Sequence, residues 1–382
     1  MLRYIFRSLK FILKLLLGMI LINILIINLY IINENSDNLR FKFERIINNS
    51  IRRDQKLDIK VDINIKHNST SKPNACLFIL VRNKELKEWL ETMKQFEKNF
   101  NSKYNYPYIF MNDVPFTQEF MQKVLEATKS KVEFGQVPKE HWSIPKWINN
   151  RNFKKKLITS LKKMWSGTKI SYHHMCRYYS GFFFRENLTL KYDYFWRIEP
   201  GVSFPCEIDY DPFKFMVDNK KLYGFSITRP ELMKSITTLW ETIKNWLDTG
   251  YKSKIPKDNA IDFISSDKGQ TLNKKACTFF NNFEIGAFSV FRDKQYLNYF
   301  DYLDKSGGFF YERWGDSAIN TFYLVMMLNK SQLHNFDDFP YFHPPRYYCP
   351  KETLKNCNPS KIPGCELGNI NRNCHSLWMK GH

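Results

Sequence analysis

The chain has 382 residues, of which 43% are hydrophobic and 16% aromatic, which suits a large buried core and excludes a disordered chain. Its net charge of +20 raises the possibility of nucleic-acid binding. No helix-turn-helix, zinc-finger or RNA-recognition pattern accompanies this charge, and we expect the basic residues to be spread out rather than clustered. The composition therefore predicts a large folded domain with no nucleic-acid partner. Its basic surface favours an anionic ligand or membrane headgroups.

The first residues of the chain predict its compartment. Residues 11–32 are apolar except for Lys14, Asn23 and Asn28 and, at about 1.5 Å each, would span roughly 33 Å as a helix, enough to cross a bilayer core of about 30 Å. A cleaved signal peptide is the alternative, but no small-residue cleavage site follows. By the positive-inside rule, we expect a cytosolic tail over 1–10, a signal-anchor helix over 11–32, a polar stem over 33–72 and a lumenal domain over 73–382.

The cysteines agree with a lumenal fate. There are eight of them, and no two form a Cys-x2-Cys pair, which disfavours structural zinc. Disulfides in an oxidising compartment fit better, although the spacing leaves their pairing open. Four Asn-x-Ser/Thr sequons are compatible with the same route: Asn48, Asn68, Asn187 and Asn329.

From residue 74 onward, strand-like and helix-like patterns follow one another. The first five expected elements are a strand over 74–83, a helix over 84–100, a strand over 108–113, a helix over 117–128 and a strand over 131–136. This alternation is typical of a parallel sheet with a nucleotide-binding half. Beyond it we expect helices over 171–184, 233–247, 294–303 and 316–328, and strands over 192–199, 221–227 and 276–285.

The strand that ends at Glu199 is the most informative of these. Pro200 lacks the N–H that a sheet ladder needs and Gly201 permits a sharp turn, so the strand has to stop there. Glu199 is then presented at the carboxyl edge of a sheet, where open α/β folds hold their ligands. A carboxylate at this place suits a divalent cation and, through it, a diphosphate. The alternative is an acid that only caps a turn.

Motifs for other chemistries are missing from the sequence. It has no Gly-x-Gly-x-x-Gly after the first strand, no Gly-x-x-x-x-Gly-Lys-Ser/Thr and no Gly-x-Ser-x-Gly. What remains is a set of acids and histidines near expected sheet ends: Glu199, Glu284, Asp316, His334 and His343. With aromatic neighbours and a basic chain, this set favours a sugar-nucleotide site, whereas His334 alone is better read as a structural residue.

Several blocks in a fixed order make the sequence similar to a known family. They include Glu140-His-Trp-Ser-Ile-Pro-Lys-Trp147, Tyr172-His-His-Met-Cys-Arg-Tyr-Tyr-Ser-Gly181, Tyr192 through Phe213, Asn282-Phe-Glu-Ile285, Gly307 through Asp316 and Phe342-His-Pro-Pro345. Over about residues 74–350 the chain resembles the fungal α-1,2-mannosyltransferases of glycosyltransferase family 15. Those are type II proteins of the Golgi that use GDP-mannose and Mn²⁺.

The resemblance implies a glycosyltransferase A-type α/β fold, with a mixed sheet flanked by helices, and retention of the anomeric configuration. Glu199 and His343 match the family's metal-binding acid and histidine, and these donors suit Mn²⁺. Glu284 matches a nucleophile that would attack the anomeric carbon or stabilise an oxocarbenium ion there. Tyr172 matches a tyrosine that lines the same site.

Two arginines are the candidate nucleotide contacts. Arg82 lies just past the first strand, and Arg177 lies on the helix that carries Tyr172. The chain departs from the family pattern at residues 286–289 and 317–320, and we expect these changes to affect acceptor choice or rate rather than the fold. The implied activity is transfer of mannose from GDP-mannose to a mannose 2-hydroxyl on N- or O-linked glycoprotein glycans. Mannosylphosphate transfer and a catalytically silent lumenal scaffold are the alternatives.

Overall fold

The computed structural model describes residues 72–338, 340–344, 346–348, 357, 362 and 372–381. The expected tail, signal anchor and nearly all of the expected stem lie outside these residues. Within the described part, every helix is too short or too polar to cross a membrane.

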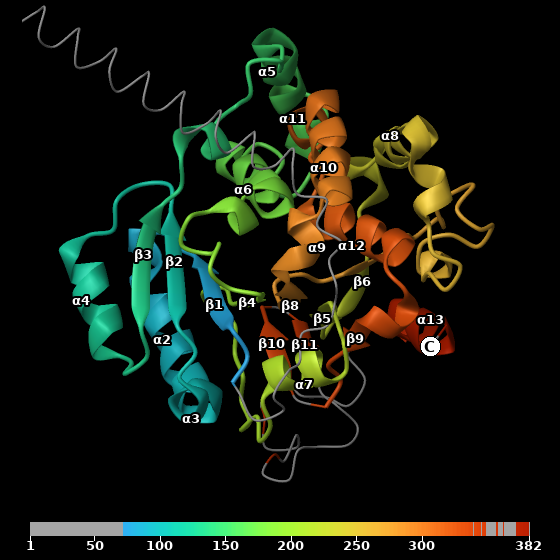
Figure 1. Ribbon diagram of the computed structural model, residues 1–382. Helices are drawn as coiled ribbons and strands as arrows, with labels where there is room; N and C mark the ends of the chain where they lie inside the picture. Colours follow the sequence, from blue (N-terminus) through green and yellow to red (C-terminus); the bar gives the residue numbers. More distant parts are fainter. Residues whose placement is uncertain are drawn as a thin grey trace, which may run out of the picture. The chain divides into compact units, whose positions relative to one another are not determined.

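A seven-stranded mixed sheet forms the centre of the fold, in the order β3-β2-β1-β4-β8-β5-β9 (Figure 1). Strands β1 to β4 are mutually parallel, whereas β8 runs antiparallel to both of its neighbours. The strands are β1 Ala75–Leu80, β2 Tyr108–Asn112, β3 Val132–Gln136, β4 Tyr194–Arg197, β5 Tyr223–Phe225, β8 Glu284–Ala287 and β9 Leu333–Asn335. Two small antiparallel pairs accompany the sheet: β6 Thr228–Pro230 with β7 Cys277–Phe279, and β10 Tyr341–His343 with β11 Arg346–Tyr348.

Helices cover both faces of the sheet and bury two separate apolar clusters. Helices α2, α4 and α7 pack on one face, and α6, α8, α9, α10, α11 and α12 belong to the cluster on the other. Their bounds are α2 Leu86–Phe96, α3 Ser102–Tyr104, α4 Gln118–Glu126, α5 Asn150–Ile158, α6 Ile170–Gly181, α7 Pro212–Asp218, α8 Leu239–Trp246, α9 Phe288–Arg292, α10 Lys294–Ser306, α11 Gly308–Tyr311, α12 Asp316–Met327 and α13 Arg372–Gly381. Both faces of the sheet are therefore buried, as in other α/β folds.

The expected β-α-β-α-β half is confirmed, but one expected strand is wrong. Residues 276–285 form β7 and β8 with a turn between them, because Asn281 leaves the sheet and donates its amide to Asp316 at 2.8 Å. Asparagine favours such turns over strand interiors. The chain keeps its direction past this turn, since β7 pairs antiparallel with β6 and β8 pairs antiparallel with β5, and β8 begins, rather than ends, at Glu284.

The C-terminal helix α13 is fastened to the domain by a disulfide. Cys374 on α13 is bonded to Cys277 on β7, and Trp378 packs edge-on against Phe279 with ring centroids 5.4 Å apart. A second disulfide joins Cys206 to Cys357. The other two cysteines of the described part are buried free thiols, Cys76 and Cys176.

Candidate active site

The antiparallel entry of β8 creates a buried cluster of charges at the end of β4. Arg197, the last residue of β4, pairs in register with Glu284, the first residue of β8. The Arg197 guanidinium donates to Glu284 at 3.3 Å, to Asp316 at 2.8 Å and to Glu199, and it lies 3.4 Å from the centre of the Tyr179 ring. One arginine therefore compensates three carboxylates in a site largely closed to water.

The same surroundings shift the pKa values of Glu284 and Glu199 in opposite directions. Burial raises the pKa of Glu284 to about 7, with Asp316 adding to the shift, although Arg197 and the Tyr223 hydroxyl at 2.9 Å oppose it. Burial also raises the pKa of Glu199, but Arg197 and His343 outweigh it and bring the value to about 2. Glu199 is therefore ionised at neutral pH, whereas Glu284 is poised near its midpoint.

Glu199 and His343 converge at the edge of this cluster. The Glu199 Oε2 atom lies 3.4 Å from His343 Nε2, and each side chain keeps about a quarter of its surface exposed. Strand β10 brings His343 here, because Phe342 exchanges backbone hydrogen bonds with Ser203 just after β4. The described residues contain no group of three or more His, Cys, Asp or Glu side chains placed to hold a metal. Glu199 and His343 are thus a pair of candidate metal ligands in this part of the chain.

A cavity of about 310 Å³ lies at the carboxyl ends of β1 and β2. Its lining includes the predicted site residues Arg82 and Tyr172, together with Asp113, Trp142 and Trp165. This is the edge at which parallel α/β sheets bind nucleotides. The structure thus brings Arg82 and Tyr172 to one cavity, where their predicted roles remain geometrically possible.

Arg313 and Asp316 link the cavity to the charge cluster. Arg313 donates to the Tyr172 hydroxyl at 3.2 Å, and Asp316, three residues later, accepts from Arg197. Arg313 has a φ of +86°, a left-handed conformation that disfavours a non-glycine residue and is held only where the surroundings impose it.

Arg177 occupies a different environment from the one predicted. Its guanidinium is buried and forms two hydrogen bonds of 2.8 Å with Asp304, and it lies 4.6 Å from the Phe182 ring centre. It does not line the cavity that contains Arg82. The geometry thus gives Arg177 buried structural partners, and its predicted nucleotide contact stays a prediction.

Sequence reasoning missed the residues that organise the cluster. Arg197 stands two positions before Glu199, a spacing that in an extended chain places both side chains on one side and is the signal that could have found it. Tyr223 and Asn281 could not be found, since their contacts depend on how β5 and β8 pair. His334 lies on the edge strand β9 and packs on Phe215 with centroids 4.4 Å apart, which agrees with a structural role.

The mixed sheet, the acid-and-histidine edge and the adjoining cavity define a glycosyltransferase, and the α/β glycosyltransferase A-type fold is confirmed by solved structures. Core-mannan synthase A of Aspergillus fumigatus, solved in its Mn/GDP form, superposes with a TM-score of 0.74 at 38% identity, covering 81% of this chain and 86% of that one. The mannosyltransferase Ktr4p of Saccharomyces cerevisiae, solved with GDP, gives a TM-score of 0.74 at 32% identity, covering 81% and 82%.

The sequence comparisons identify the family. The family model described as glycolipid 2-alpha-mannosyltransferase matches residues 30–382, and the chain belongs to this family. The glycolipid 2-alpha-mannosyltransferase of Saccharomyces cerevisiae is 43% identical over 302 residues, covering 79% of this chain and 67% of the relative. The O-glycoside alpha-1,2-mannosyltransferase omh1 of Schizosaccharomyces pombe is 40% identical over 294 residues, covering 75% and 74%.

Proposed function

We propose that the protein is a retaining α-1,2-mannosyltransferase that moves mannose from GDP-mannose to a mannose 2-hydroxyl on N- or O-linked glycans. The observation that carries the proposal is the charge cluster: Glu199, Glu284 and Asp316 held by Arg197 beside a cavity lined by Tyr172. The relatives named above for α-1,2-mannosyl transfer, and the structural neighbours solved with GDP, support the donor and the reaction.

The donor set at Glu199 and His343 fits Mn²⁺. A carboxylate and an imidazole are ligands that Mn²⁺ accepts, and a pair with exposed surface leaves room for diphosphate oxygens to complete the shell. Arg197 holds one oxygen of Glu199, which leaves Oε2 directed at His343. When bound, the metal supplies positive charge that stabilises the departing GDP.

Glu284 acts in this proposal by stabilising charge at the anomeric carbon. Its side chain has no exposed surface, and its two oxygens accept hydrogen bonds from Arg197 and Tyr223. Oxygens bound in this way are weaker nucleophiles, but they are fixed in place and need no reorganisation when positive charge develops. The geometry therefore favours stabilisation of an oxocarbenium ion over a covalent glycosyl-enzyme.

Replacing Glu199 with glutamine tests the metal site. The amide keeps the shape but lacks the charge that holds a divalent cation, so the Mn²⁺ concentration for half-maximal activity should rise at least about tenfold. The measurement is a titration of transfer activity with Mn²⁺. The control is Glu97→Gln, since Glu97 accepts hydrogen bonds from Tyr108 and Thr128 away from the site. An unchanged titration curve would remove Glu199 from the ligand set.

Replacing Arg177 with methionine separates its structural role from the predicted nucleotide contact. The change leaves Asp304 buried without a partner, so the free energy of unfolding should fall by about 3–5 kcal/mol while affinity for GDP stays the same. Denaturant unfolding and a GDP titration below the unfolding temperature measure the two effects. A tenfold loss of GDP affinity at unchanged stability would restore the nucleotide role.

The product assay decides between the proposed reactions. The full-length protein in neutral detergent is incubated with GDP-mannose, Mn²⁺ and methyl α-mannoside, and the product is weighed. A neutral added hexose that α-1,2-mannosidase removes supports the proposal. An added mannose phosphate would assign mannosylphosphate transfer, and GDP binding without product on any mannoside would favour the scaffold.

The proposed location is the Golgi membrane, in a single-pass type II topology with the catalytic domain in the lumen. The apolar run over 11–32 and its basic flank support the anchor. The two disulfides, Cys206–Cys357 and Cys277–Cys374, fit an oxidising compartment.

A further inference from the structure

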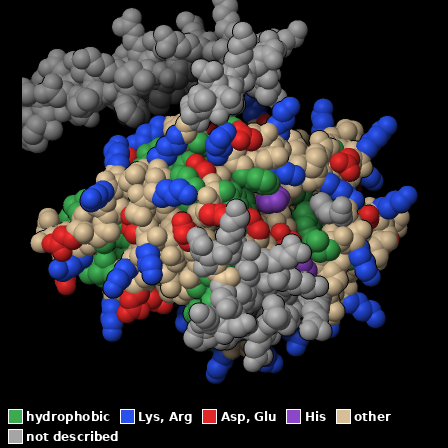
Figure 2. All heavy atoms as spheres, turned by 90° about the horizontal axis from the view of Figure 1, so that it is seen from below, with side chains coloured by type: hydrophobic (Ala, Val, Ile, Leu, Met, Phe, Trp, Pro, Cys, Tyr) green, Lys and Arg blue, Asp and Glu red, His purple; other side chains and the backbone are tan. Residues whose placement is uncertain are grey.

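Half of the net positive charge of the chain lies in one segment, so the expectation that basic residues are spread out is wrong there. Residues 141–185 contain ten Lys and Arg and no Asp or Glu. On the face shown in Figure 2, by contrast, acidic and basic side chains are interspersed, with acidic ones both in the middle and near the rim. The segment 141–185 is therefore a local source of uncompensated charge.

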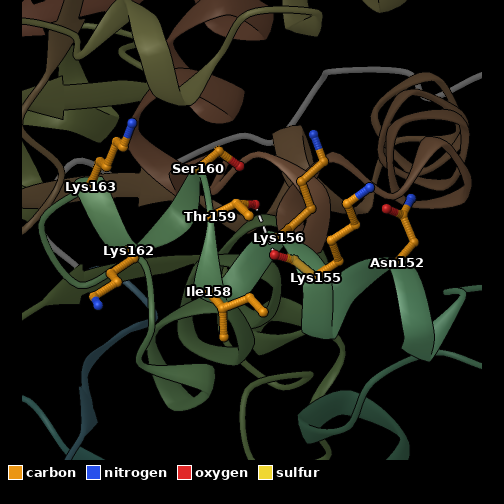
Figure 3. Close-up of a pocket in the computed structure, with 8 residues that line it drawn as sticks. All are labelled: Asn152, Lys155, Lys156, Ile158, Thr159, Ser160, Lys162 and Lys163. Atoms are coloured by element: carbon orange, nitrogen blue, oxygen red, sulfur yellow. Dashed lines mark hydrogen bonds between the residues drawn. The ribbon is translucent and has the colours of Figure 1, made fainter.

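Part of this segment forms a groove of about 620 Å³ at the end of α5. Its lining consists of Asn152, Lys155, Lys156, Ile158, Thr159, Ser160, Lys162 and Lys163. In Figure 3 the amino groups of Lys155, Lys156 and Lys163 point to the same side as the Ser160 hydroxyl. Across the described part of the chain, none of these three lysines forms an ion pair with a carboxylate. The groove thus offers three free cations among hydroxyl and amide groups.

The residues of the groove come shortly before residues of the active-site cavity in the sequence. Trp165, two positions after Lys163, lines that cavity together with Tyr172. The Trp165 side chain is 74% exposed, and its ring stands edge-on to Tyr172 with centroids 5.4 Å apart. An exposed indole suits the apolar face of a sugar ring, because its surface is large and rigid.

We propose that the groove binds a phosphate group on an anionic glycan acceptor, whose sugar chain passes over Trp165 into the cavity at Tyr172. The inference rests on the proposed function, since it names the acceptor class of that same site. Lysine ammonium groups and a serine hydroxyl are donors that match phosphate oxygens. In this arrangement the phosphate of the acceptor lies in the groove, and the acceptor hydroxyl that receives mannose lies in the cavity.

The lining favours a glycan over a lipid surface or an RNA. A bilayer contacts a raised apolar face, whereas the lysines line a hollow that also carries Asn152, Thr159 and Ser160. An RNA-binding groove would carry aromatic rings for base stacking, and the eight lining residues include none. Sugars and phosphates both use hydroxyl, amide and ammonium partners, which the groove supplies.

The test compares two acceptors that differ by one phosphate. Full-length protein in neutral detergent is assayed with a mannotriose and with the same mannotriose carrying a phosphate monoester at its far end. At about 0.05 M salt, the KM for the phosphorylated acceptor should be about tenfold lower, with similar kcat, because exposed ion pairs each contribute little. At about 0.5 M salt the difference should largely disappear, because salt screens exposed charges.

Matched lysine variants locate the effect. Lys155→Gln/Lys156→Gln/Lys163→Gln should raise the KM of the phosphorylated acceptor about tenfold and leave that of the neutral acceptor unchanged. The control, Lys252→Gln/Lys254→Gln/Lys257→Gln, removes three exposed lysines elsewhere and should change neither. Equal KM values for both acceptors in the wild type, or an equal loss in the control, overturn the proposal.

Competitors and direct binding distinguish the other outcomes. If phosphatidylserine in the micelles or polyuridylate inhibits transfer through the three lysines while the acceptor phosphate has no effect, the groove binds lipid or RNA and the proposal falls. If neither mannotriose is mannosylated, the proposed function fails instead. Equilibrium titration with the two mannotrioses then tests phosphate binding by the groove without the reaction. Binding of the phosphorylated mannotriose that is about tenfold tighter, and that loses this advantage in the triple lysine variant, supports the proposal. Equal binding of the two mannotrioses refutes it.

Discussion

Replacing Glu284 with glutamine should lower kcat for mannosyl transfer by about 10²- to 10³-fold while the affinity for GDP is kept. The amide preserves the volume and the hydrogen bond from Tyr223, but it removes the negative charge that stabilises the anomeric carbon. Steady-state kinetics and a GDP titration of the folded variant measure the two quantities. Unchanged kcat for mannosyl transfer would contradict this role of Glu284. Mannosylphosphate transfer breaks the phosphoanhydride bond, so turnover that is retained and adds a mannose phosphate would point to that reaction.

The same variant carries a pH signature. Because the pKa of Glu284 is raised to about 7, the wild-type carboxylate is mostly protonated at pH 6 and mostly ionised at pH 8. If the ionised form is required, kcat should rise with pH through about 7, and the Glu284→Gln variant should lack this step. Raising the pH has the opposite effect on stability. The folded state binds the Glu284 proton more tightly than the unfolded chain does, so the free energy of unfolding falls as pH rises from about 4.5 to 7.

Glu186→Gln is the matched control. Glu186 is also a buried glutamate, at 6% exposure, but it pairs with His141 at 3.0 Å outside the charge cluster. Its replacement should leave kcat and the pH profile near those of the wild type. A comparable loss of kcat in this control would mean that any buried carboxylate matters for the fold and would withdraw the special role of Glu284.

Replacing Arg197 with methionine should lower the free energy of unfolding at pH 7 by about 3–5 kcal/mol and abolish transfer. The change removes the cation shared by Glu199, Glu284 and Asp316, and breaking a buried ion pair from one side leaves uncompensated charge in a low dielectric. Denaturant unfolding measures the effect. At pH 5 the loss should be smaller, because burial raises the pKa values of Glu199 and Glu284 once Arg197 is removed, and these carboxyls then take up protons.

Arg185→Met provides the comparison for Arg197. Arg185 is an arginine of intermediate exposure that packs near three phenylalanine rings, and its contact with Asp301 is 3.9 Å long with a carboxylate 57% exposed. Methionine keeps most of that packing, so the cost should stay below about 1 kcal/mol. Equal costs at Arg185 and Arg197 would contradict the idea that Arg197 compensates the cluster.

The sequence predicts the first half of the fold well because its signals are local. Residues 74–136 have long apolar runs and amphipathic helices, and the strands and helices appear there with boundaries shifted by only a few residues. The expected helix over 233–247 begins later, since regular α-helix starts only at Leu239 after a short turn. The strand expected over 276–285 fails for a tertiary reason: the hydrogen bond from Asn281 to Asp316 bends the chain.

Only part of the candidate site can be predicted from the sequence, because the rest depends on tertiary contacts. Glu199 and His343 meet as the family resemblance implies, and Arg82 and Tyr172 share a cavity. The role of Arg197 depends on which strand pairs with β4 and in which direction, and no local pattern encodes that choice. Arg177 shows the converse: its sequence position suggested a ligand contact, and packing against Asp304 and Phe182 gives it another partner.

The antiparallel pairing of β4 with β8 also determines when, during synthesis of the chain, the active site can form. The contacts of Arg197 with Glu284 and Asp316 join residues separated by 87 and 119 positions. The ribosome therefore completes β1 to β4 long before it adds Glu284 and Asp316, the partners of Arg197. Long-range contacts of this kind form late, because closing the loop costs entropy before any contact repays it. Competence to transfer sugar thus coincides with completion of the fold, so an incompletely folded chain has no working site.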